Sequence, residues 1–200
     1  MSILAANDLL AAYRAGRRDF TGVKLHGANF VGLQLQGIIL KNADLSFSNF
    51  EGTDLSGADF SSAILARCNF HNAIMKEARF DAADLSYANI RNTFIDGTSF
   101  RNAKMMWAHL CGNDLMKADI SSAQLDWSCL IDTKMTGDQV AVVPKTSVVT
   151  LNPAEHEQKL LYAQPQRQSS VYETKTATET IMTGYTMPQP KKGGDKKMYC

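Results

Sequence analysis

Histidine and cysteine, the side chains that most often hold metals or act as nucleophiles, are few and scattered in this sequence. The four histidines form no HxH or HExxH pattern, and no two cysteines form a CxxC pair. The wide spacing of Cys68, Cys111, Cys129 and Cys200 also fits no dense disulfide framework. The sequence therefore predicts free thiols and no metal site.

Motifs for catalysis and nucleotide binding are missing as well. The sequence contains no GxSxG, P-loop or GxGxxG. Cys129 follows His109 by 20 residues, a spacing that becomes relevant below, but a nucleophilic dyad also needs a cleft and an oxyanion site. We expect no catalytic residue, no cofactor and no small-molecule substrate, and hence a protein that is not an enzyme.

Charge and hydropathy narrow the function further. The 200 residues carry 21 Lys or Arg and 20 Asp or Glu, a formal net charge of +1, so the whole chain gives no electrostatic reason to bind DNA or an anionic membrane. No stretch approaches the roughly 18 consecutive apolar residues of a membrane span, and no basic region precedes an apolar run at the N-terminus. We expect a soluble protein of the cytoplasm.

A five-residue repeat organises most of the chain. From Phe20 to Met135 every fifth residue is Phe, Leu, Ile or Met, and the residue two before it is usually Ala, Thr, Ser or Cys. Four positions depart from the second rule, namely Val23, Leu33, Ile38 and Asn113. A period of five matches neither a helix nor an ordinary strand. It indicates a solenoid whose chain turns a corner every five residues.

The repeat units resemble those of the pentapeptide-repeat family, which read A(D/N)Lxx. Close matches are Ala43-Asp44-Leu45-Ser46-Phe47, Ala58-Asp59-Phe60-Ser61-Ser62 and Ala83-Asp84-Leu85-Ser86-Tyr87. The resemblance covers about residues 20–136. It implies an all-β solenoid, a right-handed quadrilateral β-helix with four units per coil and about six coils.

The sequence supports a coil of 20 residues. Sorted at this spacing, the central phenylalanines fall on two opposite faces, and the other two faces hold only Leu, Ile and Met. A second ladder precedes the central residue on one face and consists of Asn29, Asn49, Asn69, Asn89 and His109. Stacked amides of this kind hydrogen-bond along the axis, so we expect this ladder to be structural.

Both ends of a solenoid expose core and strand edges and need caps. Residues 1–19 hold strong helix formers, and Gly16 is a residue at which a helix would stop. This pattern predicts an N-terminal helical cap over residues 1–19. The repeat rule stops after residue 136, and residues 137–151 are interpreted as a C-terminal cap. Within it, the valine-rich stretches 140–144 and 148–151 suggest a short pair of strands.

Residues 152–200 change in composition and are interpreted as an extended polar tail. Prolines, many Gln, Ser and Thr, and a basic end leave little apolar area to stabilise a fold. Asn152, Pro153 and Glu155 predict a short helix over 153–163. The tail is either disordered or ordered along a partner. In the second case its anchors include Leu160, Leu161, Tyr162, Tyr172 and Tyr185.

One outward column stands out from the rest of the surface. Two residues after the central position on one face, successive coils carry Phe47, Arg67, Tyr87, Trp107 and Trp127, flanked by Ile64 and Met106. Exposed aromatics flanked by apolar residues are typical of an interface core. The column is covered by the chain's own segments, by a different protein, or by a second copy in a homodimer.

Two classes of function remain. The first is a structural or adaptor protein that binds protein partners through the column and the tail. The second follows from the family, some of whose members mimic duplex DNA and bind type II topoisomerases, conferring quinolone resistance. That role requires an acidic rod, whereas residues 20–136 hold ten Lys or Arg against twelve Asp or Glu. It also requires a C-terminal dimer module, which the tail does not resemble. We therefore favour the adaptor.

The N-terminal run 9–20, LLAAYRAGRRDF, resembles the openings of many cyanobacterial pentapeptide-repeat proteins. If the chain is cyanobacterial, the resemblance points to a large assembly such as the phycobilisome, in which linker proteins combine folded modules with extended segments. No single residue identifies that partner.

Overall fold

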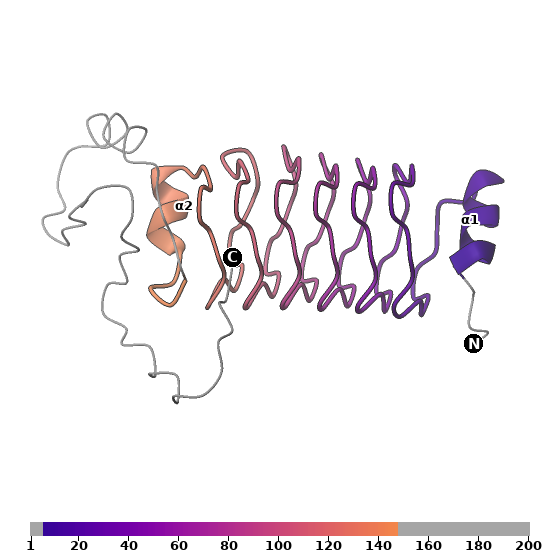
Figure 1. Cartoon of the computed structure of the whole chain (residues 1–200), viewed down its shortest axis with the longest axis horizontal. Coiled ribbons are helices and arrows are strands. Elements are labelled where there is room, and N and C mark those ends of the chain that lie inside the picture. The colour runs from indigo at the N-terminus through magenta and orange to yellow at the C-terminus, as the bar shows by residue number, and fades with distance from the viewer. Residues whose placement is uncertain (1–5, 148–200) are drawn as a thin grey trace, which may run out of the picture.

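A long stack of coils lies between two short helices (Figure 1). The computed structural model describes residues 6–147, and the helices are α1 (Ala6–Arg14) and α2 (Gly137–Val142). Figure 1 shows α1 at one end of the stack and α2 at the other. The tail 152–200, with its expected helix over 153–163, lies outside the described residues.

The coils pair in parallel at a register of 20 residues. Backbone bridges join residues 20 positions apart at almost every fifth position, from the pair Asp19 and Ile39 to the pair Asp114 and Lys134. The Phe50 N–H, for example, donates to the Asn69 carbonyl at 2.7 Å, and the Asn69 N–H donates to the Ser48 carbonyl at 3.0 Å. The 20-residue coil expected from the sequence is confirmed as a parallel β-helical solenoid.

The sides of the coils are shorter than ordinary strands. Within residues 6–147 the pairings are isolated bridges, because a turn follows every few residues and leaves no room for a longer extended segment. The expectation of an all-β solenoid therefore holds for the pairing, and the elements with continuous regular structure are the two helices.

Apolar side chains fill the interior of the coils in two opposed phenylalanine stacks. Phe50 and Phe70 stack with ring centroids 5.0 Å apart, and Phe60 and Phe80 do the same on the opposite face. The two stacks meet edge to face, as where Phe70 approaches Phe80 at 5.8 Å. All of these rings are fully buried. The segregation of phenylalanine to two faces is confirmed.

Small residues at the second inward position let neighbouring coils approach, and the polar ones are satisfied. Thr53 donates its hydroxyl proton to the Phe30 carbonyl at 2.7 Å. Asn113, which departs from the rule, is buried and donates through Nδ2 to the carbonyls of Ile90 and Leu110. Its Oδ1 accepts the Thr93 N–H at 2.7 Å, so the exception is a satisfied core amide.

Aspartates at the start of many corners fix the turn that follows. The Asp44 carboxylate accepts the Ser46 hydroxyl proton at 2.6 Å, and that of Asp119 accepts the Ser121 hydroxyl at 2.5 Å and its N–H at 3.0 Å. In both cases the serine hydroxyl bond is the main reason that the pKa of the carboxyl is lowered, because it stabilises the charged form. These turns are therefore strongest when the aspartates are ionised.

We expect the solenoid to lose stability in acid. Carboxyls with lowered pKa values in the folded state bind protons more weakly than in the unfolded chain, so the free energy of unfolding should be constant above about pH 5 and fall as the pH drops through the usual Asp range. Urea melts followed by circular dichroism between pH 3 and 7 measure this. Asp44→Asn, which keeps an acceptor but does not titrate, should reduce the slope. A stability that rises on acidification would contradict the expectation.

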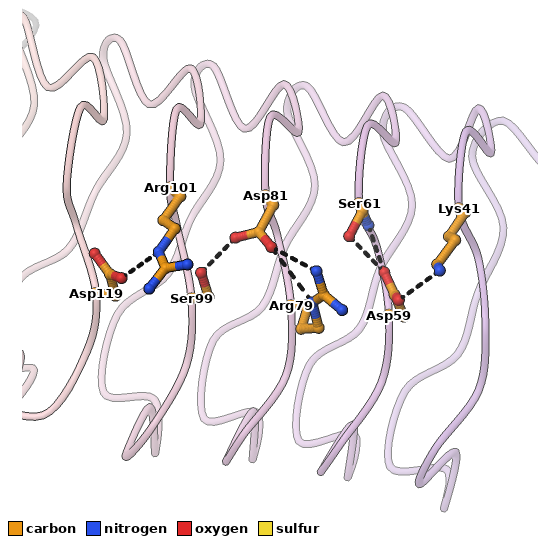
Figure 2. Close-up of polar contacts among 8 residues, drawn as sticks. All are labelled: Lys41, Asp59, Ser61, Arg79, Asp81, Ser99, Arg101 and Asp119. Carbon is orange, nitrogen blue, oxygen red and sulfur yellow. Dashed lines mark hydrogen bonds and ion pairs between the residues drawn. The ribbon is translucent and has the colours of Figure 1, made fainter.

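A charged ladder lies along another face of the solenoid (Figure 2). Lys41 pairs with Asp59 at 3.1 Å, Arg79 with Asp81 at 3.0 Å and Arg101 with Asp119 at 2.5 Å, and Ser99 donates its hydroxyl proton to Asp81. Exposed pairs of this kind contribute only about 0 to 1 kcal/mol each. We interpret the ladder as a solvated structural face.

Helix α1 packs on the first coil through its apolar side. Leu9 is fully buried, and the Tyr13 hydroxyl donates to the Gln36 carbonyl at 2.8 Å. The helix ends at Arg14, and Gly16 follows two residues later with a φ of 98°, which lets the Arg17 N–H reach the Ala12 carbonyl at 3.0 Å.

Helix α2 replaces the strand pair expected in 137–151. Residues 140–142 are helical, while 148–151 lie outside the described residues. A capping box between Thr136 and Gln139 begins the helix, and the Gln139 amide also donates to the carbonyls of Leu115 and Ala118 at 2.8 and 3.0 Å. The strand interpretation of 140–144 was wrong because these contacts outweigh the β preference of the valines.

Candidate protein-interaction site

The outward column forms one continuous stack on the surface. Tyr87 and Trp107 are parallel with centroids 6.2 Å apart, and Trp107 and Trp127 are parallel at 5.2 Å. The Arg67 guanidinium carbon lies 4.8 Å from the Tyr87 ring centroid and 5.8 Å from that of Phe47. The 20-residue coil therefore brings all five predicted residues together, and we call them the aromatic column.

His26 extends the aromatic column and was not predicted from the sequence. Its ring centroid lies 5.0 Å from that of Phe47. It occupies the residue before the corner, whereas Gly27 occupies the corner itself, so sorting by corner position does not find it.

Most of the aromatic column is exposed. The exposed fraction is 55% for Phe47, 49% for Tyr87 and 38% for Trp107. The flanking Ile64 and Met106 are exposed at 46% and 37%. A contiguous strip of exposed apolar side chains is typical of a surface that contacts another molecule.

The backbone under the aromatic column is unfavourable for large side chains. All five members have φ between 60 and 62°. This left-handed region costs a residue with a Cβ about 1 to 2 kcal/mol. Small or polar residues, mainly glycine and asparagine, occupy the same corner on the other three faces. Stacking returns only about 0.5 to 1.5 kcal/mol per aromatic pair.

The fold therefore does not need aromatic residues at these corners. A run of strained positions that the scaffold tolerates is a reason to infer a function at that place. Charged residues around the strip include Lys24, Asp44, Asp84, Lys104 and Asp126. Charged residues of both signs beside an apolar strip resemble the polar rim of a protein interface.

The described chain ends beside this column. Thr146 donates to the Asp126 carboxylate at 3.1 Å, and the Ser147 hydroxyl contacts the Leu125 carbonyl. Both contacts flank Trp127. The predicted tail anchors Leu160, Leu161, Tyr162, Tyr172 and Tyr185 lie outside the described residues, so their role stays a prediction.

The asparagine ladder forms on a separate face. Asn69 donates to Asn49 Oδ1 at 3.1 Å and accepts at its own Oδ1 from Asn89 at 2.9 Å. At the end of the ladder Arg91 lies 3.1 Å from His109 Nδ1. Burial, followed by the charge of Arg91, lowers the pKa of His109 and favours its neutral form. The structural role predicted for the ladder is consistent with these bonds.

The cysteine and histidine pairing considered above does not form a nucleophilic dyad. Cys129 Sγ lies 2.7 Å from Cys111 Sγ, a hydrogen-bond contact and not a disulfide between these two residues. Cys129 is itself disulfide-bonded, which corrects the expectation of a free thiol at this residue. Cys68 and Cys111 are free. Burial raises the pKa of the Cys68 thiol to about 12, so it is not a thiolate at neutral pH.

Within 6–147, no three side chains of the His, Cys, Asp and Glu types come together as metal ligands would. Neither helix of that range is long and apolar enough to cross a membrane.

Comparison with known proteins identifies the repeat. A family model for pentapeptide repeats matches eight copies, over residues 38–76 and 63–102. No curated protein matches the chain. Similar solved structures include the pentapeptide-repeat protein Rfr23 of the cyanobacterium Cyanothece 51142, with 20% identity over 71% of this chain and 99% of that one and a TM-score of 0.41.

Two other similar structures carry functional descriptions of their own. HetL of the cyanobacterium Nostoc sp. PCC 7120, involved in regulating heterocyst differentiation, is 25% identical over 66% of this chain and 69% of that one, with a TM-score of 0.32. QnrB1, a plasmid-mediated fluoroquinolone resistance protein, is 14% identical over 72% and 89% of the two chains, with a TM-score of 0.29. The match shows that residues 38–102 consist of pentapeptide repeats, and the parallel register of 20 residues runs on either side of them, from Asp19 to Lys134.

Proposed function

We propose that this protein is a non-enzymatic adaptor whose rigid solenoid presents the aromatic column to a protein partner. The observation that carries the proposal is the placement of five large side chains at left-handed corners that the fold fills elsewhere with small or polar residues. The proposal includes the finer architecture expected from the family, a right-handed quadrilateral helix of about six coils with α1 as its N-terminal cap.

The geometry of the aromatic column suits recognition of a protein surface. Stacked rings fix one another's orientation before binding, so little rotamer entropy is lost when a partner covers them. Trp and Tyr are also the residues most enriched among interface hot spots. A linker role in a cyanobacterial assembly such as the phycobilisome is the narrower form of this proposal, and it rests on the N-terminal run 9–20.

DNA mimicry has less support. The face in Figure 2 pairs its carboxylates with Lys41, Arg79 and Arg101, so this face does not present a continuous negative strip. A duplex mimic needs uncompensated charges at phosphate-like spacing.

Replacing Trp107 by glycine should separate binding from folding. Glycine is the residue that the repeat itself uses at this corner, as at Gly27, so the backbone is retained and its strain is relieved. We expect the affinity for the partner to fall by about 2 kcal/mol or more, roughly 30-fold in Kd, with no loss of thermal stability.

The experiment uses the full chain as bait in an extract of the source organism, followed by calorimetric titration of the purified captured protein. Phe94→Ala is the matched control, because it removes an aromatic ring that is 59% exposed on a different face. Equal binding by wild type and Trp107→Gly, or equal loss with Phe94→Ala, would show that the aromatic column is not the site.

A further inference from the structure

The strongest unexplained feature is the relation between the aromatic column and the point where the described chain ends. We propose that residues 148–162 of this same chain cover the aromatic column in the free protein and are displaced when a partner binds. This inference rests on the proposed function, because it assigns a regulation to the same surface.

The position of residue 147 directs the following segment to the column. Ser128 donates its hydroxyl proton to the Ser147 hydroxyl at 3.3 Å, and Thr146 is held on Asp126. Trp127 lies between Asp126 and Ser128, the two residues to which Thr146 and Ser147 are attached. Residue 148 therefore starts next to the C-terminal end of the aromatic column.

The length of chain is sufficient to follow the aromatic column. From Trp127 to Phe47 the column crosses four coil spacings, about 19 Å at the usual distance between paired strands. An extended chain advances about 3.3 Å per residue, so roughly six residues span it. The 15 residues from 148 to 162 reach the far end even with a turn.

The composition of the segment complements the column in order. Val148, Val149 and Leu151 come first and would meet the exposed rings of Trp107 and Tyr87. Glu155 and Glu157 follow, and residues 148–158 contain no Lys or Arg. Arg67, farther along the column, has no ion pair with any of residues 6–147, so a carboxylate of this segment supplies the missing partner.

The two tryptophans of the chain allow a direct test in the full-length protein. Both Trp107 and Trp127 belong to the aromatic column, so intrinsic fluorescence reports on this surface alone. The test variant carries Val148→Asp, Val149→Asp and Leu151→Asp. The matched control carries Val171→Asp, Ile181→Asp and Met182→Asp, which introduce the same charge farther along the chain.

We expect the acrylamide quenching constant of the test variant to be at least twice that of wild type, with a red-shifted emission, and the control to match wild type. A synthetic peptide of residues 148–162, added to the test variant, should restore protection. A second variant, Glu155→Lys with Glu157→Lys, should raise quenching in the same direction. Unchanged quenching in the test variant overturns the inference. Protection of the tryptophans from quenching in wild type that disappears on dilution also overturns it, because this result would identify a second copy of the chain as the cover.

The same proteins separate this inference from the proposed function. If the inference and the proposed function are both right, the test variant binds the purified partner at least threefold more tightly than wild type does. The Trp107→Gly variant then no longer binds this partner. If quenching is unchanged but Trp107→Gly still loses the partner, only the inference fails. If quenching rises but Trp107→Gly binds the partner normally, the aromatic column serves the chain's own segment and the proposed function fails.

Discussion

Replacing Phe70 by alanine is expected to lower the free energy of unfolding by about 3 to 5 kcal/mol. The ring is fully buried, stacks on Phe50 at 5.0 Å and meets Phe60 and Phe80 edge to face. Its removal leaves a cavity between two coils whose spacing is fixed by backbone hydrogen bonds, so the neighbours cannot collapse to fill it. Urea unfolding followed by circular dichroism measures the change.

Phe94→Ala is the control for this experiment. The Phe94 ring is largely exposed, so its loss should change the free energy of unfolding by less than about 0.5 kcal/mol. Comparable losses for the two variants would mean that the two inward phenylalanine stacks do not form the stabilising core.

Leu9→Ala in helix α1 is the second substitution with a large expected effect, about 2 to 4 kcal/mol of destabilisation. Leu9 is fully buried against the first coil. Without it α1 loses its anchor, and the first coil's apolar interior, including Phe20 and Leu25, becomes accessible to water and to other chains. The measurement is the melting temperature together with light scattering during heating.

Leu10→Ala provides the matched comparison, since it makes the same change one residue later in the same helix. Leu10 is only partly buried, so its substitution should cost less than half as much. If both variants melt and scatter light like wild type, α1 is not a cap for the solenoid.

Local sequence was sufficient for the architecture of the solenoid. The large residue at every fifth position and the small residue two before it specify which side chains point inward, and each five-residue unit repeats the same turn. Asp44 and Ser46 illustrate this, because their bond closes within three residues of the chain. Adding the 20-residue coil then placed Tyr87, Trp107 and Trp127 in one column.

Contacts between distant residues had to be read from the structure. His26 joins the aromatic column from a different repeat position, and Cys111 approaches Cys129 although no sequence motif links them. The valines near the C-terminal end favour a strand locally, yet Gln139 reaches back more than 20 residues to the Leu115 and Ala118 carbonyls and the segment is helical.

The sequence by itself therefore determined the pentapeptide repeat and its inward faces, because these depend on interactions within one unit or on a strictly periodic stack. Only the tertiary structure decided how the end of the solenoid is covered and which partners complete the surface columns. Arg91 and His109 show the reason. The neutral form of this histidine depends first on burial between coils and then on a charge 18 residues away, and neither is encoded in the local pattern.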